Sequence, residues 1–253
     1  MNSLLIALIA FASIFGGALL GFAIQCVLPD HHLRPESKDT VKLGAGLIAT
    51  MAALVLGLLV SSSKSTYDSV NTGLIQMSAK AITLDRLLAQ YGPETKEIRS
   101  ELRDSVTHTV HLVWPELNSG LTGVKALEGS KTGERLAVHV RQLTPKSDEQ
   151  RAIHAQSMQI VADIMQSKWV LVQQHHTKLP LIFLIILISW FAILNITYGI
   201  FAPRNVTVIA VLFFCALSVS ASLLLIVEMN SPLDGLIKVS SDPMLNALKH
   251  LGE

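Results

Sequence analysis

The second apolar stretch of this chain reads LGAGLIATMAALVLGLLV, from Leu43 to Val60. It holds no charged residue, and Lys42 and Lys64 close it at its two ends. An α-helix rises about 1.5 Å per residue, so roughly 20 apolar residues cross the hydrocarbon layer of a bilayer. The stretch is short but sufficient, and it predicts a transmembrane helix.

Three further stretches predict membrane spans by the same rule: Leu4 to Leu28, Leu179 to Ala202 and Val206 to Val227. No Lys or Arg precedes Arg34, whereas a cleaved signal peptide has basic residues before a shorter apolar core. The first stretch is therefore expected to remain as a helix. Only residues 203–205 separate the last two stretches, and so short a turn predicts an antiparallel hairpin.

The charged residues are concentrated in the middle of the chain. Between Ser61 and Lys178 lie 14 of the 20 Lys and Arg and 12 of the 19 Asp and Glu. The remainder is nearly uncharged, as a part embedded in lipid must be. The fold class expected is all-α and integral membrane, with four transmembrane helices and a helical, water-facing segment between the second and the third. The expected parts are residues 1–60, 61–178, 179–229 and 230–253.

Charge and cysteine content exclude several classes of protein. The net charge of +1 comes from interspersed signs, so there is no basic stripe for binding nucleic acid. Cys26 and Cys215 both lie in apolar runs, which predicts neither a disulfide framework nor a zinc site.

Four spans place both termini and the middle segment on one side of the membrane. Six Lys lie near membrane ends on that side, against four Lys or Arg on the other. This excess favours a cytoplasmic middle segment and cytoplasmic termini by the positive-inside rule. The two sets are Lys64, Lys80, Lys168, Lys178, Lys238 and Lys249 on one side, and Arg34, Lys38, Lys42 and Arg204 on the other.

A heptad pattern begins ten residues after the second stretch. Apolar or small residues alternate at spacings of four and three, which predicts a helix that packs against a partner helix. No Pro or Gly intervenes between Val60 and Asn71, so the second span is expected to continue into this helix until Gly92 and Pro93 end it. Its partner can belong to the same subunit or to a neighbour, and this seam is the one best placed for contacts between subunits. Its members are Val70, Leu74, Met77, Ala81, Leu84, Leu88 and Tyr91.

The rest of the middle segment also has helical patterns. A helix with one apolar face from Ile98 to Val113 is expected to end at Pro115 and to have a charged, solvated opposite face. Residues 118–133, with four glycines, predict a loop, and a short amphipathic helix covers residues 134–143. A long helix beginning near Ser147 is expected to lead directly into the third span.

Motifs that carry chemistry are scarce. The chain has nine His, including adjacent pairs at residues 31–32 and 175–176 and an i, i+3 pair at His108 and His111. No Cys accompanies them, so a metal site is not expected. The phosphate-binding, dinucleotide-binding, nucleophile-elbow and zinc-protease motifs are absent from the sequence. Neither enzymatic activity nor a cofactor is therefore expected.

The second stretch is unusually rich in small residues. Gly46, Thr50, Ala53 and Gly57 form one stripe that leads to Ser61, Ser62 and Ser63. Small residues let helices approach closely, and composition alone favours this explanation. The same stripe, arranged around a symmetry axis, is suited to line an ion pore, with hydroxyl groups at Thr50 and Ser61–Ser63.

Polar residues mark the end of the fourth span. Glu228 is followed by Asn230 and Asp234, and a carboxylate at membrane depth is a functional candidate. At a helix end it can also simply reach water. These three residues form a candidate polar site at the membrane exit.

Three segments resemble the bacterial bestrophin-like family, a domain class of unknown function. They are the stretch from Leu43, the motif LDRLL at residues 84–88 with YGP at 91–93, and SPLDG at 231–235 followed by VSS at 239–241. The resemblance covers nearly the full length. It implies similarity to bestrophins, which are oligomeric anion channels with four membrane helices per subunit, cytosolic termini and a pore lined by the second span and its continuation.

The sequence departs from bestrophins at two places. Their bulky aromatic neck has no counterpart between Gly46 and Gly57, and their acidic calcium-binding run is reduced to Glu228 and Asp234. Calcium gating therefore does not follow from the resemblance.

The function expected is a homo-oligomeric anion channel or pore in a bacterial inner membrane, with five subunits by analogy. Its pore-lining candidates are Gly46, Thr50, Ala53, Gly57 and Ser61. The alternative is a non-conducting scaffold or signalling subunit whose cytoplasmic helices bind a partner. A membrane enzyme would need a polar cluster from Glu228, Asn195 and the histidines near Lys178, and their spacing offers no support.

Overall fold

The computed structural model describes residues 3–29, 35–114, 132–176, 181–233 and 235–252, and within them every regular element is helical. The all-α prediction is confirmed. The elements, in chain order, are α1 (Ser3–Val27), α2 (Pro35–Tyr91), the 3-10 turn η2 (Pro93–Thr95), α3 (Lys96–Val113), α5 (Thr132–Arg141), α6 (Asp148–His176), α7 (Leu181–Phe201), α8 (Val206–Met229) and α9 (Asp242–His250).

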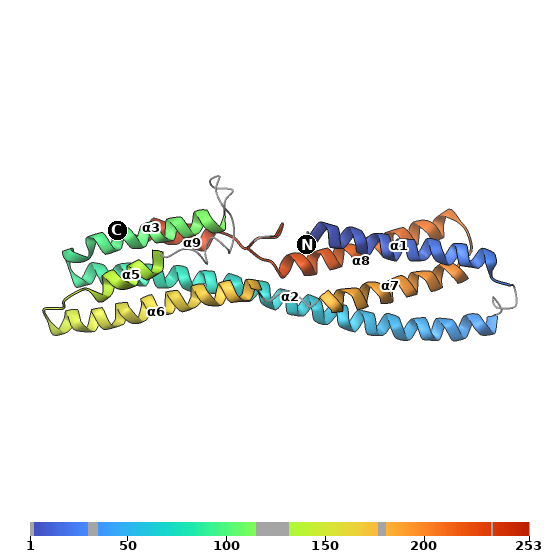
Figure 1. The fold of residues 1–253 in the computed structure, drawn as a ribbon, viewed down its shortest axis with the longest axis horizontal. Helices are drawn as coiled ribbons and strands as arrows, with labels where there is room; N and C mark the ends of the chain where they lie inside the picture. The colour runs from blue at the N-terminus through green and yellow to red at the C-terminus, as the bar shows by residue number, and fades with distance from the viewer. Residues whose placement is uncertain (1–2, 30–34, 115–131, 177–180, 234, 253) are drawn as a thin grey trace. The chain divides into compact units, whose positions relative to one another are not determined.

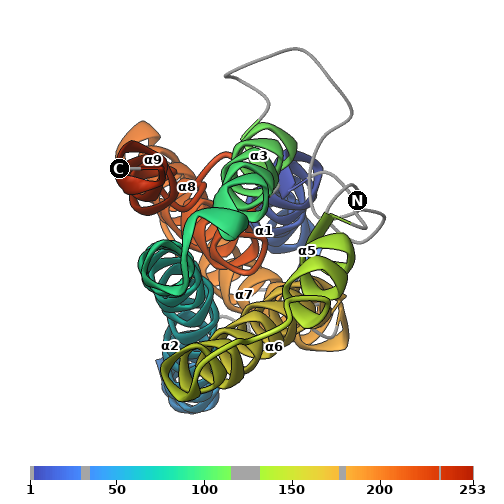
Figure 2. The same ribbon diagram turned by 90° about the vertical axis from the view of Figure 1, so that its left-hand side faces the viewer.

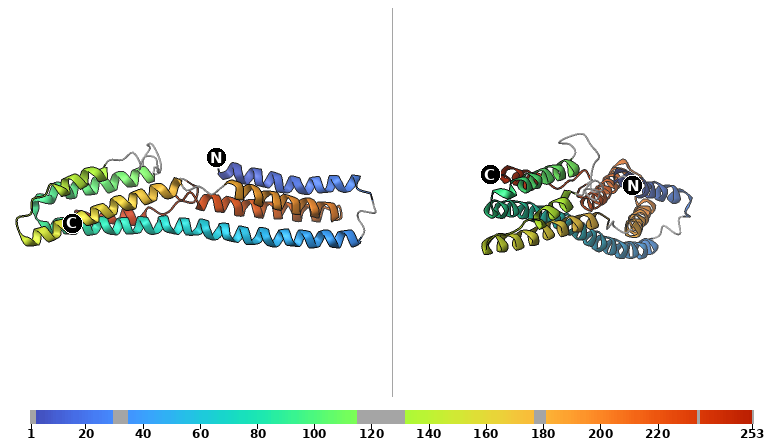
Figure 3. Two further views of the ribbon diagram at one scale, coloured as in Figure 1. Left: turned by 60° about the horizontal axis from the view of Figure 1, so that its bottom comes forward. Right: turned by 60° about the vertical axis from the view of Figure 1, so that its left-hand side comes forward.

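Four helices of the described chain are long and apolar enough to cross a membrane, as predicted: α1, α2, α7 and α8. The protein is therefore an integral membrane protein with four transmembrane helices. The second span continues without a break into the heptad region, because α2 is one helix of 57 residues (Figure 3). The expected continuity of the long helix α6 into the third span falls on residues 177–180, which lie outside the described residues.

The chain divides into two compact units. The first, here called the membrane unit, comprises Met1–Ser65 and Leu179–Asn230, and the second, here called the water-facing unit, comprises Thr66–Lys178 and Ser231–Glu253. The C-terminal residues thus group with the middle segment. The sides of the membrane on which these parts lie remain a prediction.

Helix α1 packs along α7 and α8 in the membrane unit (Figure 1). Two glycines one turn apart on α1 make the closest approach. A Cβ atom at Gly17 would lie 2.9 Å from the carbonyl oxygen of Ala192, and one at Gly21 would lie 2.9 Å from the Cα atom of Gly199. Real Cβ atoms do not approach so closely, so only glycine permits this spacing between the two backbones, as in small-xxx-small membrane motifs.

The turn between α7 and α8 is short, and it joins the two helices at the end of α1. The side chain of Asn205 caps α8 by accepting a hydrogen bond from the backbone N–H of Val208 at 2.8 Å. Arg204 donates from Nη2 to the carbonyl oxygen of Phe22 at 3.1 Å and from Nε to Gln25 Oε1 at 3.0 Å. These bonds satisfy groups at the C-terminal end of α1, where a cation is favourable.

The water-facing unit has a core built around the heptad seam of α2. All seven seam residues are buried within this one chain, among apolar side chains of α3, α5, α6 and the C-terminal segment. Of the two partners left open for the seam, the described chain itself provides one. A seam that is filled by its own chain has no surface left for a neighbour.

The seam ends where predicted, at Gly92 and Pro93. Gly92 has φ of +144°, a conformation that L side chains rarely adopt, and Pro93 opens η2. The buried hydroxyl group of Thr95 donates to the carbonyl oxygens of Leu88 and Gly92, which closes the turn between α2 and α3. This turn sends α3 back along α2.

The remaining helices complete this core. Helix α5 lies beside α6 (Figure 2), and it begins at Thr132, so the last two residues of the expected loop at 118–133 are helical. The rest of that loop, residues 118–131, lies outside the described residues. The C-terminal segment packs through Val239 and α9, and Trp114 Nε1 donates to the carbonyl oxygen of Val239 at 2.8 Å.

Candidate functional site

The predicted pore-lining residues share one face of α2 in the membrane unit. Positions that differ by seven or eleven lie close together in angle on a helix of 3.6 residues per turn. Gly46, Thr50, Ala53, Gly57 and Ser61 are all exposed, and no heavy atom lies within 4 Å of a Cβ atom built at either glycine. We call these five residues the small-residue face. Nothing in the described part of this chain covers its glycines.

The opposite face of the same span packs into the membrane unit. Ala45, Ala52 and Leu59 are buried, and the last two belong to an apolar cluster with residues of α1, α7 and α8. Tight packing, which composition favoured for the small residues as a whole, is therefore realised at Ala45 and Ala52. Within the described chain it is not realised at Gly44, Gly46 or Gly57.

A row of leucines borders the small-residue face on one side. The side chains of Leu43, Leu47, Leu54 and Leu58 are 69–75% exposed. Sequence reasoning missed this row, although successive positions in it differ by four or seven residues, as they do on one face of a helix. The uncovered face of the span is therefore half small and half bulky, and it is apolar apart from Thr50 and Ser61.

The hydroxyl groups at this face differ in what they can offer. Thr50 Oγ1 donates to the carbonyl oxygen of Leu47 at 2.8 Å, so its proton is engaged by the helix and its lone pairs remain. Ser61 and Ser62 are exposed, whereas Ser63 is fully buried, and its hydroxyl group has no hydrogen-bond partner among the described residues. Including Ser63 among the axial hydroxyl groups was wrong, because residues two apart lie about 200° apart on a helix.

Of the three membrane-exit residues, Glu228 and Asn230 lie within the described chain. The side chain of Glu228 is only 3% exposed and accepts a hydrogen bond from Ser3 Oγ at the start of α1. The positive end of the α1 dipole also favours a carboxylate there. Asn230 follows α8, and its backbone N–H bonds the carbonyl oxygen of Ile226 at 3.2 Å. Asp234 lies outside the described residues. The Glu228 side chain does not reach open water in the described chain, and its hydrogen bond with Ser3 ties α8 to α1.

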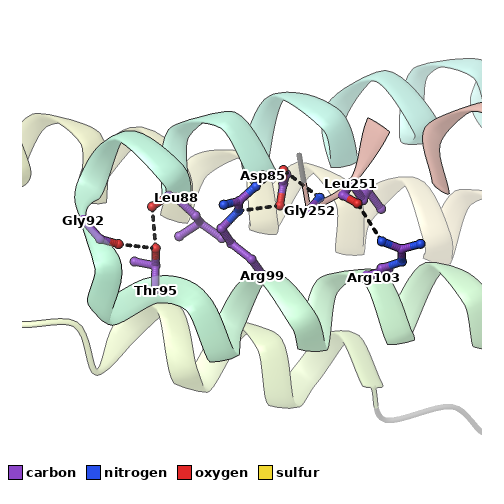
Figure 4. Close-up of polar contacts among 8 residues, drawn as sticks. All are labelled: Asp85, Leu88, Gly92, Thr95, Arg99, Arg103, Leu251 and Gly252. Carbon is purple, nitrogen blue, oxygen red and sulfur yellow. Dashed lines mark hydrogen bonds and ion pairs between the residues drawn. The ribbon is translucent and has the colours of Figure 1, made fainter. Parts of the chain in front are cut away.

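A buried ion pair in the water-facing unit was missed by sequence reasoning (Figure 4). The Asp85 side chain is fully buried, and Arg99 donates to both of its oxygens, from Nε and Nη2, at 2.8 Å each. The backbone N–H of Gly252 donates to Asp85 Oδ2 at 3.2 Å, and Arg103 Nη1 donates to the carbonyl oxygen of Leu251 at 3.0 Å. The hydrogen bond to Asp85 raises the pKa of the Arg99 guanidinium.

This pair joins α2, α3 and the C-terminal segment. Helix α3 was expected to have a charged and solvated outer face, and at Arg99 that expectation is wrong, because the guanidinium is needed to compensate a buried carboxylate. The available signal was the position of Asp85, directly after the seam residue Leu84. A charged residue so close to a buried stripe requires a partner.

In the part of the chain that the structure describes, the histidines do not belong to a metal-binding cluster, because no three His, Cys, Asp or Glu side chains lie close enough together there to hold one metal ion. His108 and His111 are exposed on α3. The pair at residues 31–32 and the side chains of residues 175–176 lie outside what the structure describes.

Asn195, the remaining polar candidate in the membrane, is buried in α7. Its Nδ2 donates to the carbonyl oxygen of Phe191 at 3.0 Å, and its Oδ1 has no hydrogen-bond partner among the described residues. Within the described chain Asn195 makes no hydrogen bond to Glu228, and the side chains of the histidines near Lys178 lie outside what the structure describes.

Comparison with known proteins gives a family and a fold. Residues 12–244 match the Bestrophin-like domain family. Among solved structures, a bacterial bestrophin homologue from Klebsiella pneumoniae that carries a point substitution superposes with a TM-score of 0.60. The alignment covers 94% of this chain and 97% of that chain at 15% sequence identity, which is a likeness of fold. No curated protein matches.

Proposed function

Because the chain belongs to the bestrophin-like family, we propose that it forms a homo-oligomeric anion channel in a bacterial inner membrane, with α2 facing the central axis. Family and fold together indicate a channel-type membrane protein. Beyond family and fold, we propose that the subunits assemble around an axis, that the permeant ion is an anion and that α2 lines the pore. Five subunits follow by analogy to bestrophins, with the termini and the water-facing unit in the cytoplasm.

One observation supports α2 as the helix that lines the pore. The small-residue face of α2 is uncovered, while the opposite face of the same span is packed. An uncovered face in a membrane meets lipid, another subunit or water in a pore. Glycines add no bulk beside an axis, so a ring of such faces leaves room for an ion, and the bordering leucines are suited to contact the neighbouring subunit.

The chemistry of this face suits a weakly held ion. The span from Leu43 to Val60 contains no charged residue, so selectivity there depends on dipoles, with the hydroxyl groups of Thr50 and Ser61 as contacts. An ion must enter readily and must also leave, which such weak contacts permit. Anions as the permeant species rest on the similarity to bestrophins.

The test is anion flux from liposomes that contain the purified full-length protein. Gly57→Trp should abolish flux while the oligomer keeps its size, because the indole ring projects from the small-residue face. Gly44→Trp is the matched control: Gly44 lies on the same helix and is equally uncovered, but it points about 140° away from Gly57 around the helix. Gly44→Trp should retain flux.

Two outcomes would contradict the proposal. Undiminished flux through Gly57→Trp would remove α2 from the axis. Absence of flux in the unsubstituted protein, over a range of pH and calcium concentration, would favour the non-conducting scaffold, whose cytoplasmic helices bind a partner.

A further inference from the structure

The chain between α8 and α9 forms a short loop whose two ends are fixed in the water-facing unit. The backbone N–H of Val239 donates to the carbonyl oxygen of Pro232 at 2.9 Å, which closes the loop at its base. Leu233 and Val239 are buried in the apolar core, where Trp114 Nε1 donates to the carbonyl oxygen of Val239. Residues 235–238, here called the loop tip, lie between these fixed ends.

The loop tip exposes two large apolar side chains. Leu236 is 70% exposed and Ile237 is 39% exposed. The other exposed large apolar side chains in the described part of the water-facing unit reach only 45–47%, so Leu236 is the most exposed of the set. Single exposed apolar residues are ordinary on protein surfaces, so exposure alone does not identify a partner for these two. The position of the loop along the chain does.

The chain holds the loop tip close to the end of α8. Asn230 caps the C-terminal end of that helix. The backbone N–H of Gly235 donates to the carbonyl oxygen of Ser231 at 2.9 Å, so the residues between them advance about 6 Å, at 1.5 Å per residue. Consecutive Cα atoms are about 3.8 Å apart, so Leu236 lies within about 14 Å of Asn230. Because the chain itself sets this limit, it holds for every orientation of the two units.

A hydrogen bond to α2 gives a second limit. Tyr67 Oη donates to the carbonyl oxygen of Lys238 at 3.4 Å. Tyr67 lies seven residues after Val60, the last residue of the second apolar stretch, and a helix of that length advances about 10 Å. The polar headgroup layer extends roughly 5–8 Å beyond the hydrocarbon core on each side. The loop tip is therefore held within reach of this layer.

We propose that Leu236 and Ile237 insert into the headgroup layer of the bilayer, on the side of the membrane where α8 ends. Apolar side chains next to a lysine suit this layer, because the apolar groups enter the acyl boundary while the cation stays among anionic phosphates. Lys238 follows the two apolar residues directly. The proposal needs the membrane spans and not the pore, so it holds whether or not the protein conducts ions.

The first test measures what surrounds Leu236 in the full-length protein in liposomes. A Leu236→Cys variant, with Cys26 and Cys215 replaced by serine, takes an environment-sensitive fluorophore. Lipids with a nitroxide near the headgroup should quench most of its emission, and aqueous iodide on both sides of the membrane should quench little. Val138→Cys is the matched control, because Val138 is 46% exposed but lies 41 residues before Leu179, the nearest expected span. Its label should show the opposite response.

Two results would overturn the proposal. Quenching of the Leu236 label by iodide as strong as that of the Val138 label would place the loop tip in water. Resistance of the Leu236 label to both quenchers would place it against protein, such as a neighbouring subunit.

The second test needs no substitution. A phospholipid that carries a photoreactive diazirine on its headgroup should cross-link to residues 235–238 of the unsubstituted protein, and mass spectrometry locates the adduct. Residues of α5, which are remote from every span along the chain, should acquire far less of it. Cross-links confined to the membrane spans, or as frequent in α5 as in the loop tip, would refute the contact with lipid.

Discussion

Two sets of glycines in the membrane unit lie in opposite surroundings, one set on α1 and α7 and the other in the membrane stretch of α2. At Gly17, Gly21 and Gly199 the backbone of the facing helix occupies the place where a Cβ atom would be, whereas nothing lies within 4 Å of that place at Gly44, Gly46 and Gly57. Both sets belong to membrane stretches that contain no charged residue. Glycine therefore serves close packing within the subunit in one case and leaves a face without bulk in the other.

The two sets also differ in the other contacts of their helices. Helix α1 is held on the glycine side by α7, and at its ends by Ser3 with Glu228 and by Arg204. The small-residue face of α2 has no such contacts at its glycines within the described chain. In the proposed oligomer, this small-residue face is the part of α2 that would meet the axis or a neighbouring subunit.

The largest effect is expected from a substitution at the close contact between α1 and α7. Gly21→Leu should abolish the folded protein, because its Cβ atom alone would meet the backbone of Gly199 at 2.9 Å, and backbone cannot move aside as a flexible side chain can. Thermal unfolding and size-exclusion chromatography in detergent measure the loss. Gly16→Leu is the control on the same helix, since Gly16 has nothing within 4 Å. A stable Gly21→Leu variant would mean that α1 and α7 are not in this close contact.

An intermediate effect is expected in the water-facing unit, away from both sets of glycines. Arg99→Ala leaves the fully buried Asp85 carboxylate without its bidentate partner, which should cost about 3 kcal/mol of stability. Thermal unfolding should report it, and flux through the protein that remains folded should be retained. The double variant Asp85→Leu with Arg99→Met removes both charges and should recover much of the loss. A single variant as stable as the unsubstituted protein would show that Asp85 is not buried.

The smallest effect is expected from a substitution on the small-residue face of α2. Gly57→Ala should stabilise the folded protein by less than about 1 kcal/mol, because alanine has the higher helix propensity, and should leave association of the subunits unchanged. Thermal unfolding measures the first effect, and oligomer dissociation during dilution in detergent measures the second. Marked weakening of the oligomer would show instead that a neighbouring subunit packs tightly against Gly57, so that the small-residue face is a subunit interface and not a pore wall.

Much of the fold could be read from sequence because its signals are local. Four long stretches without a charged residue predicted the four spans. The absence of Pro and Gly directly after Val60, together with the heptad pattern from Val70, predicted that α2 continues to Gly92 and Pro93. The same pattern did not reveal the partner of the heptad seam. A heptad pattern predicts that apolar side chains cover the seam, but it does not tell whether they come from the same chain or from a neighbouring subunit.

The candidate site was less predictable for the same reason. The spacing of Gly46 and Gly57 placed them on one face, but their exposure depended on where α1, α7 and α8 pack. Ser63 was misassigned by neglect of its angle around the helix. The Asp85–Arg99 pair joins residues 14 positions apart with a backbone group near the C-terminus, and no local pattern connects these three.

The sequence by itself determined that this chain is a helical membrane protein with four spans, since the cost of placing charge in lipid acts on each residue wherever its neighbours lie. Only the tertiary structure decided which glycines pack and which stay uncovered, and which charged residues pair inside the water-facing unit. Those outcomes depend on the atoms that approach from other helices, and contacts between residues distant in sequence leave no periodic pattern along the chain.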